Sequence, residues 1–363
     1  MPAAIPDEAL ARAVRAAFGD GARIADVVAL AGDASSRRYV RLHLTNGGTA
    51  PPSTVVMLLG ADRFPLGTDE LGARPAGDEL PFVNVARYLA ARGLAVPAIY
   101  LDASRAEGLL LLEDVGDTTL WAAAAARPAA AWELFEAAAD LLVALQVAGA
   151  TAPDPACYAF RQRFDGRLAR WELEHFVEHG IETRHGCRLA PAERAGLLDA
   201  LGPIAGPFES GQPVLTHRDF MAWNLHVQNG RLRLIDFQDA LLGPDAYDLA
   251  ALLTDRTTGT IITPALEERL IAHFCRARAA AGLPVAGGAA DFLARYRCCA
   301  LQRALKVIGR FYFLERVKGK PGYLAYLPGV YAVARRMLAA LPAITGLQGR
   351  LAVHVPELGM ESA

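Results

Sequence analysis

The chain has 363 residues, of which 53% are hydrophobic and 21% charged, and its formal net charge is −2. This composition is typical of a globular protein and excludes a disordered or fibrous chain, and the length predicts about two domains. Since no excess of positive charge is present to neutralise a phosphate backbone, we do not expect nucleic acid as a partner. Lysine occurs only as Lys306, Lys318 and Lys320, so the first 305 residues contain arginine but no lysine.

Nothing in the sequence predicts export or membrane insertion. The N-terminal residues include Asp7 and Glu8 and lack the basic and apolar regions of a signal peptide. The alanine-rich stretch 120–150 is interrupted by charged residues, so it offers no apolar window long enough to span a bilayer. The five cysteines have no metal-ligand spacing and predict reduced, mostly buried thiols. We therefore expect a cytoplasmic monomer without a membrane partner.

The first part of the chain predicts a small sheet with helices. A helical pattern over 7–18 ends at Gly19-Asp20-Gly21, and Gly, Pro and charged residues in 60–81 predict a long loop. The remaining patterns predict three strands, a helix and two further strands, over 24–30, 38–44, 54–59, 82–92, 98–101 and 108–112.

After residue 116 the pattern changes to long amphipathic helices, which a short β segment at 214–237 interrupts. The sequence therefore predicts an α+β protein of two domains. The first domain, 1–113, contains the sheet, and the second, 114–363, is mostly helical.

The β segment has the strongest local signals. Asn229-Gly230 is a two-residue hairpin turn, with 225–228 and 231–234 as its arms. Pairing around this turn puts Asn224 opposite the residue before Asp236, so both side chains reach one ion only if the ladder frays or bulges. Asp219 lies in the loop ahead of the first arm. Two carboxylates and an amide oxygen are hard ligands, which suit Mg²⁺ rather than zinc.

Phosphoryl transfer uses such a set, with one carboxylate accepting the proton of the attacking hydroxyl and two oxygen ligands holding Mg²⁺ against the phosphates. The pattern is His217-x-Asp219-x(4)-Asn224, followed by Ile235-Asp236-Phe237 and Tyr247-Asp248-Leu249-Ala250. These motifs resemble the catalytic and metal loops of the aminoglycoside phosphotransferase-like branch of the protein-kinase-like fold.

The resemblance implies a bilobal kinase-like fold with an antiparallel sheet in the N-terminal lobe, and it implies ATP and Mg²⁺ as cofactors. Position by position, Asp219 would be the general base, and Asn224 and Asp236 would be the Mg²⁺ ligands. His217 would keep the loop in shape, and Asp248 would support it from the following helix.

The same resemblance assigns a nucleotide site in the first domain. Residues 109–112 with Glu113 and Val115 resemble the hinge strand, whose backbone groups pair with adenine. Small residues between the first two strands would form the turn that covers the phosphates. The residues of this turn are Gly32, Asp33, Ala34, Ser35, Ser36 and Arg37.

One position departs from the kinase pattern. Met57 stands on the third strand where a lysine normally holds the α- and β-phosphates. Methionine cannot bind a phosphate, so an active enzyme would use another cation, for which Arg37, Arg38 and Arg41 are the candidates. The alternative is a nucleotide-binding regulatory protein without catalysis.

Further motifs resemble the anomeric N-acetylmuramate and N-acetylglucosamine kinases of bacterial cell-wall recycling. They lie at 32–41, 235–244, 301–311 and 319–324, so the resemblance covers both domains from about residue 24 to 330. It implies transfer of the ATP γ-phosphate to the C1 hydroxyl of the amino sugar. Met221 and Ala222 occupy loop positions where this family is expected to be more polar, which bears on substrate preference.

A cationic helix face predicts where an anionic substrate group binds. Arg303, Lys306 and Arg310 follow at i, i+3 and i+7, and they suit the carboxylate of muramic acid. A polycationic aminoglycoside or another alcohol is the alternative substrate, for which acidic residues are expected there. On an earlier helix, a polar cluster is a candidate for sugar hydroxyls, and two histidines are expected at the surface. The cluster is Glu172, Glu174, His175 and Glu178, and the histidines are His179 and His185.

Overall fold

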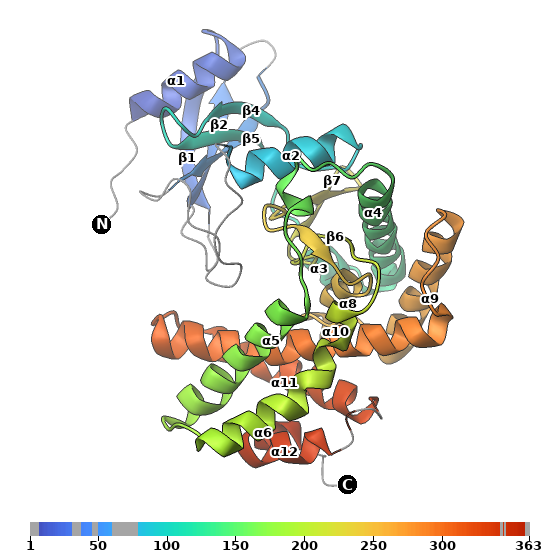
Figure 1. The fold of residues 1–363 in the computed structure, drawn as a ribbon. Coiled ribbons are helices and arrows are strands. Elements are labelled where there is room, and N and C mark those ends of the chain that lie inside the picture. Colours follow the sequence, from blue (N-terminus) through green and yellow to red (C-terminus); the bar gives the residue numbers. More distant parts are fainter. Residues whose placement is uncertain are drawn as a thin grey trace. The chain divides into compact units, whose positions relative to one another are not determined.

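The computed structural model describes residues 7–30, 38–45, 50–59, 79–341, 344 and 346–359. The chain divides into two compact units (Figure 1), Met1–Asp117 with His226–Gln238, and Thr118–Leu225 with Asp239–Ala363. The sequence placed its boundary between residues 113 and 114 and kept the segment 226–238 with the helical domain. The predicted phosphate-covering turn, 32–37, lies outside the described residues, and so do residues 60–78 of the predicted loop 60–81.

The first unit contains a five-stranded antiparallel sheet with the strand order β1-β2-β3-β5-β4. The strands are β1 (Arg23–Leu30), β2 (Arg38–Thr45), β3 (Ser53–Leu58), β4 (Ile99–Ala103) and β5 (Leu109–Glu113). They are accompanied by α1 (Asp7–Phe18) and α2 (Pro81–Ala91). The expected strands and helices of this part are therefore present, with ends shifted by one or two residues.

The alternation of side chains on the strands explains how this sheet packs. On one face, Val56 and Leu111 are fully buried and form a core with Leu10 and Val14 of α1. Met57 points from the same strand to the opposite face because successive residues alternate, and it is also fully buried. The position expected for a lysine is therefore filled by a core side chain.

The hairpin of β7 (Leu225–Gln228) and β8 (Arg231–Leu234) forms as expected, and its turn residues Asn229 and Gly230 have φ angles of 50° and 74°. These left-handed conformations match a two-residue hairpin turn. The N–H of Leu234 donates to the carbonyl of Ala95 at 2.9 Å, and Gln228 Nε2 donates to the carbonyl of Asp114 at 2.8 Å. These bonds explain why the hairpin belongs to the first unit.

The second unit is mostly helical, with β6 (Val214–Thr216) and β9 (Leu241–Gly243) as a two-stranded antiparallel sheet. Its long helix α10 (Gly288–Tyr312) packs against α8, α5, α11 and the π-helix η3 (Phe176–Thr183). The α-helices are α3 (Leu120–Ala126), α4 (Ala131–Thr151), α5 (Gly166–His175), α6 (Pro191–Leu201), α7 (Gly206–Glu209), α8 (Tyr247–Leu253), α9 (Pro264–Ala280), α11 (Leu327–Ala339) and α12 (Leu347–His354). The sequence did not predict β9 or the π-helix.

One described helix, Pro128–Thr151, is long and apolar enough to cross a membrane. Half of its most apolar window is buried inside the protein, and α4 packs against α9 and β6. A core helix has the same length and composition, so this helix is weak evidence for a membrane span.

Two surface expectations were wrong. His179 is only 8% exposed, because its ring packs against those of His175 and Phe313. The five cysteines are free, but only Cys157 and Cys299 are buried, while Cys187 is exposed.

Candidate active site

The loop between β6 and β7 holds two of the predicted site residues, Asp219 and Asn224. Its shape comes from tight turns, since the N–H of Met221 donates to the carbonyl of Asp219 at 2.8 Å and Arg218 has a φ of 76°. Phe220 and Ala222 are fully buried and anchor the loop. The side chain of Asp219 is 36% exposed, so its carboxylate is open to a reactant.

Asp248 supports this loop from the first turn of α8. Its carboxylate accepts the backbone N–H groups of His217 at 2.6 Å and Arg218 at 2.9 Å. Burial raises the pKa of Asp248 to about 7, and the two N–H bonds and the charge of Arg303 oppose this rise. The Asp248 side chain, 30 residues later in the chain, therefore stabilises the left-handed backbone conformation of Arg218.

Cations surround the Asp219 carboxylate. Arg303 Nη2 lies 3.6 Å from Asp219 Oδ1. Burial alone would raise the pKa of Asp219, but the charges of Arg303, Lys306 and Arg218 outweigh it and hold this pKa below its usual value. Asp219 is therefore ionised near neutral pH and able to accept a proton.

The cations themselves are held by Glu172, which is fully buried. Its carboxylate receives Arg218 Nη2 at 3.1 Å, Lys306 Nζ at 2.7 Å and Gln302 Nε2 at 2.6 Å. Glu172 lies in the interior rather than on the exposed face that the sequence suggested. Its carboxylate pairs with Arg218, in the catalytic loop, and with Lys306 of α10.

The three residues of the predicted cationic face differ in exposure. The side chain of Arg303 is 6% exposed and that of Lys306 is 16% exposed. Arg303 Nη1 donates to the carbonyl of Arg218 and the hydroxyl of Tyr247, each at 3.3 Å. Arg310 lies over the ring of Phe313 at 5.4 Å. Arg303 and Lys306 thus have carboxylate partners inside the protein.

Sequence reasoning missed Asp255, which follows α8 and is 7% exposed. Burial raises the pKa of Asp255, and the charges of Arg303 and Arg256 oppose this rise, while Asp219 adds to it. Its Oδ2 atom has no hydrogen-bond partner among the described residues. The signal in the sequence was an acidic residue placed two positions after a fully apolar helical turn.

The predicted metal ligands have oxygen atoms suited to Mg²⁺. Asn224 Nδ2 donates to the carbonyl of Asp219 at 2.9 Å, which turns the amide oxygen of Asn224 away from that carbonyl. Asp236 has a left-handed φ of 62°, and Gln238 Nε2 donates to its Oδ1 at 2.9 Å. The left-handed residue interrupts the regular alternation after β8, as the sequence analysis required. Asn224 and Asp236 belong to different units, so their joint ligation stays a prediction.

The predicted hinge residues follow the end of β5. Glu113 accepts the N–H of Ala98 at 3.0 Å and pairs with Arg233. Val115 is 8% exposed, and within the described part of the chain no group accepts a hydrogen bond from its N–H. A buried residue with an N–H available for bonding is compatible with recognition of a base edge.

Arg41, one candidate for the missing lysine, is engaged elsewhere. Its Nε donates to Asp114 at 2.7 Å and its Nη1 to Asp117 at 2.8 Å. Hydrogen bonds with both carboxylates raise its pKa. Arg41 thus connects β2 to the segment after β5, while Arg38 pairs across from Leu58, and Arg37 lies outside the described residues.

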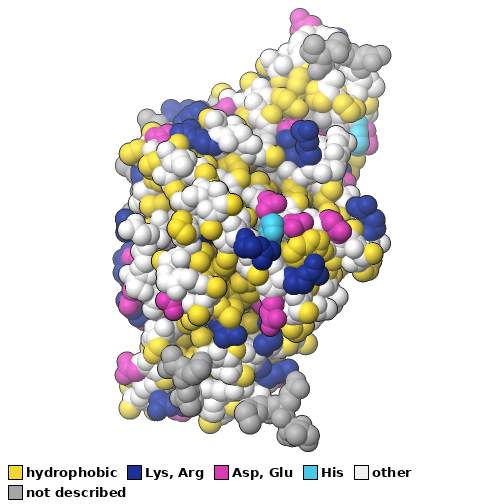
Figure 2. Space-filling model, turned by 90° about the vertical axis from the view of Figure 1, so that its right-hand side faces the viewer, with side chains coloured by type: hydrophobic (Ala, Val, Ile, Leu, Met, Phe, Trp, Pro, Cys, Tyr) yellow, Lys and Arg dark blue, Asp and Glu magenta, His cyan; other side chains and the backbone are white. Residues whose placement is uncertain are grey.

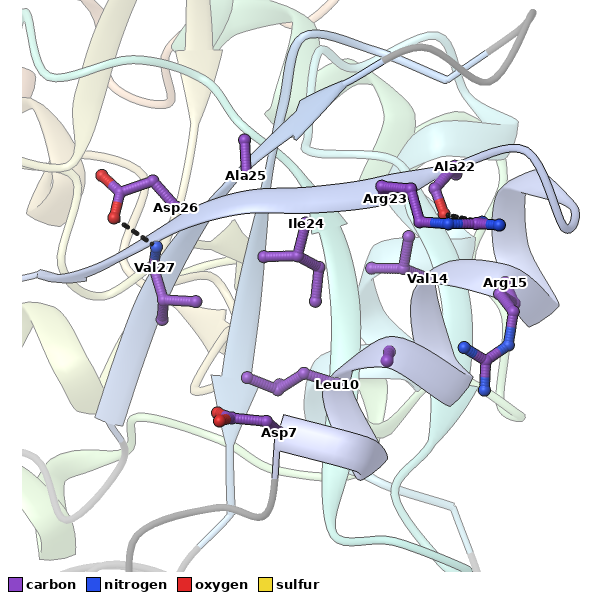
Figure 3. A pocket seen from close by; sticks show the side chains of 11 residues that line it. Asp7, Leu10, Val14, Arg15, Ala22, Arg23, Ile24, Ala25, Asp26 and Val27 are labelled. Carbon is purple, nitrogen blue, oxygen red and sulfur yellow. Dashed lines mark hydrogen bonds between the residues drawn. The ribbon is translucent and has the colours of Figure 1, made fainter.

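A pocket of about 570 Å³ lies between α1 and β1 in the first unit. Figure 3 shows Leu10, Val14 and Ile24 in its interior, with Asp26 and Arg15 towards its ends. No residue of the predicted site lines it. On the face shown in Figure 2, acidic and basic side chains are interspersed among hydrophobic ones, without a broad surface of one charge.

Comparisons with known proteins agree with these motifs. The model described as "Phosphotransferase enzyme family" matches residues 26–286. The N-acetylmuramate/N-acetylglucosamine kinase of Pseudomonas aeruginosa is 32% identical over 333 residues, which cover 92% of this chain and 89% of that protein. The protein of the same name from Caulobacter vibrioides is 32% identical over 372 residues, covering 95% and 96%.

Solved structures share the fold at low sequence identity. A choline/ethanolamine kinase family protein from Mesorhizobium loti has a TM-score of 0.58 at 14% identity and covers 98% of this chain and 99% of its own. The aminoglycoside phosphotransferase APH(4)-Ia, solved with AMP-PNP and hygromycin B, has a TM-score of 0.54 at 18% identity, covering 90% and 98%. The protein-kinase-like fold is confirmed, and the chain belongs to the phosphotransferase enzyme family.

Proposed function

We propose that this protein is an ATP-dependent kinase that phosphorylates the C1 hydroxyl of N-acetylmuramate or N-acetylglucosamine, giving the sugar 1-phosphate, in the cytoplasm during peptidoglycan recycling. The relatives that share 32% identity over most of the chain carry the name of this activity. The observation that carries the proposal is the half-buried Asp219 carboxylate, which Arg303 keeps ionised in a supported loop.

Asp219 acts as the general base in this proposal. It accepts the proton of the C1 hydroxyl as that oxygen forms a bond to the γ-phosphorus and the bond between this phosphorus and the β–γ bridging oxygen breaks, releasing ADP. A carboxylate of lowered pKa is ionised before the acceptor arrives, and positioning then supplies most of the catalysis. Asp248 maintains the position of the loop through the N–H groups of His217 and Arg218.

Asn224 and Asp236 are the residues that would hold Mg²⁺. Their carboxylate and amide oxygens match the ligands that Mg²⁺ prefers, and both residues flank the hairpin of β7 and β8 in the chain. When bound, Mg²⁺ neutralises the charge on the β- and γ-phosphate oxygens. Gln238 orients the Asp236 carboxylate through its bond to Oδ1.

Backbone groups of Glu113 and Val115 are proposed to pair with adenine, and the turn 32–37 to cover the phosphates. Since Arg41 is bound to two carboxylates, Arg37 and Arg38 remain as the candidates for the missing lysine. Either arginine would approach the phosphates from the start of β2, whereas the lysine of the kinase pattern approaches them from β3.

The acceptor site is proposed next to Asp219, with positive charge for the lactyl carboxylate of N-acetylmuramate from Arg303 and Lys306 and, farther along α10, from Arg310. The buried Glu172 neutralises part of this charge, since it binds Lys306 directly. The remaining charge favours a neutral or anionic sugar over a polycationic antibiotic.

The test is a screen of acceptors with ATP and Mg²⁺, using ³¹P detection of a sugar 1-phosphate. We expect phosphorylation of at least one of the two amino sugars by the wild-type protein and none by Asp219→Ala. If only an aminoglycoside were phosphorylated, the proposal of an amino-sugar acceptor would be wrong. ATP binding without transfer to any acceptor would instead indicate a regulator.

A further inference from the structure

Three potential metal ligands lie on consecutive turns of one helix, outside the proposed catalytic loop. His175 is the last residue of α5, and Glu178 and His179 lie in the first turn of η3. One ligand atom from each residue lies within 4.8 Å of the other two. The spacing His-x-x-Glu-His places the residues at i, i+3 and i+4, on one face of a helix.

The hydrogen bonds determine which nitrogen of His179 is available. The Thr183 hydroxyl donates its single proton to the carbonyl of Glu178 at 3.0 Å. The same oxygen lies 3.0 Å from His179 Nδ1, so it accepts the Nδ1–H. The lone pair of His179 is therefore on Nε2, which faces the Glu178 carboxylate at 3.9 Å. A ligating histidine typically donates its other N–H to a neighbouring acceptor in this way.

Two acceptors facing each other at this distance favour a cation between them. His179 is only 8% exposed, so its ring is largely shielded from water. Arg188 Nη1 is 3.9 Å from Glu178 Oε1, but it is bound more closely by the buried carboxylate of Glu182, at 2.8 Å, so Glu178 is not its main partner.

Aromatic rings hold both imidazoles. Trp171 stacks on His175 with ring centroids 5.5 Å apart, and the centroid of Phe313 lies 5.3 Å from that of His175 and 4.9 Å from that of His179. The two imidazoles meet edge to face at 4.3 Å. Rings that are fixed in this way lose little freedom when they bind an ion.

We propose that His175, Glu178 and His179 bind one divalent transition-metal ion of the zinc class. Two imidazoles and one carboxylate are a known ligand set for Zn²⁺, with water completing the tetrahedron. This ion is distinct from the Mg²⁺ of phosphoryl transfer, which prefers oxygen ligands. The role of the bound transition-metal ion is to stabilise the junction of α5 and η3. Glu172 lies on α5, one turn before this junction.

The test uses the chelator-treated full-length chain in a Cys187→Ser background, which removes the exposed thiol as a competing ligand. Calorimetry with Zn²⁺ and absorption spectroscopy with Co²⁺ measure binding. We expect one ion per chain and a higher melting temperature with Zn²⁺. His179→Ala should weaken binding at least 100-fold. Thr183→Val, which removes the acceptor for Nδ1–H together with the hydroxyl bond to the Glu178 carbonyl, should weaken it about 10- to 100-fold.

His273→Ala is the matched control. His273 also lies beside two carboxylates, with Nε2 2.7 Å from Asp140 and Nδ1 3.4 Å from Glu136. Its removal should leave Zn²⁺ binding unchanged. If His179→Ala fails to fold by circular dichroism, Glu178→Gln at the half-buried carboxylate replaces it and should also lose the site. Absence of saturable binding, or binding that survives His179→Ala or Glu178→Gln, would overturn the proposal.

Discussion

Lys306 Nζ lies 2.7 Å from Oε1 of Glu172, a carboxylate that is fully buried. The same carboxylate binds Arg218, so one buried anion balances two cations beside the catalytic loop. A buried charge is tolerated only with such partners, and removing one partner is expensive. Glu172 thus connects the stability of the second unit to the electrostatics of Asp219.

Replacing Glu172 should therefore be strongly destabilising. In Glu172→Gln, Arg218 and Lys306 lose their common counter-charge, and we expect the free energy of unfolding to fall by about 3–5 kcal/mol. Urea unfolding at pH 7 measures it. Glu174→Gln, two residues away and exposed, is the control and should change it by less than about 0.5 kcal/mol. Equal effects of the two substitutions would contradict this interpretation.

Asp219→Asn should lower kcat without unfolding the protein. Its side chain is partly exposed and the backbone of the loop is held by Asp248, so the fold does not depend on the carboxylate. Loss of a general base reduces the rate by about 10²- to 10⁴-fold. ATP binding, measured by calorimetry, should persist. A variant with nearly wild-type kcat would exclude Asp219 as the base.

Local signals in the sequence were sufficient for the hairpin and the loop motifs. Asn229-Gly230 specifies its turn through backbone preference alone, and the spacing from His217 to Asn224 is a local property of the chain. The strands β1 to β5 were predicted for the same reason, since their alternation and flanking turns are local.

Long-range contacts could not be predicted in this way. Arg41 meets Asp114 across 73 residues, and Gln302 meets Glu172 across 130. In the sequence, Arg41 was a candidate phosphate ligand and Glu172 a candidate sugar contact, because the sequence does not state which distant residue is the partner of each. His179 was misplaced for a similar reason, since nothing in the sequence indicated that its ring packs against those of His175 and Phe313.

Asp236→Asn should raise the Mg²⁺ concentration required for half-maximal activity and lower kcat. The left-handed φ of 62° is compatible with asparagine, so the backbone is retained while the ligand loses its charge. Activity measured against Mg²⁺ concentration tests this. Asn229→Asp, also at a positive φ of 50°, is the control and should leave the Mg²⁺ requirement unchanged. An unaltered requirement in Asp236→Asn would remove Asp236 from the metal site.

The raised pKa of Asp248 makes stability depend on pH. Its pKa is about 7 in the folded protein and about 4 in the unfolded chain, so the folded state binds the proton more tightly. The stabilisation from this proton is complete below about pH 4 and is lost as the pH rises through about 7. The free energy of unfolding should therefore decrease more between pH 5 and pH 7.5 in the wild type than in Asp248→Asn. Equal decreases in both proteins would show that Asp248 titrates normally.

Gly309 on α10 should not tolerate a side chain, because the helix approaches the backbone of η3 there. A Cβ atom at this position would lie 2.7 Å from Phe176 Cα and 3.0 Å from the carbonyl of His175. Backbone atoms cannot move aside as a flexible side chain does, so we expect Gly309→Ala to destabilise the protein by about 1–3 kcal/mol. The Gly309→Ala variant should also have lower activity, since α10 carries Arg303 and Lys306.

Gly196→Ala is the matched control, because Gly196 lies inside α6 with no atom within 4 Å of the new Cβ. This substitution should stabilise the protein by about 0.5–1 kcal/mol. Thermal unfolding measures both changes, and the melting temperature should fall in Gly309→Ala and rise in Gly196→Ala. A higher melting temperature in Gly309→Ala would show that α10 and η3 do not pack this closely in solution.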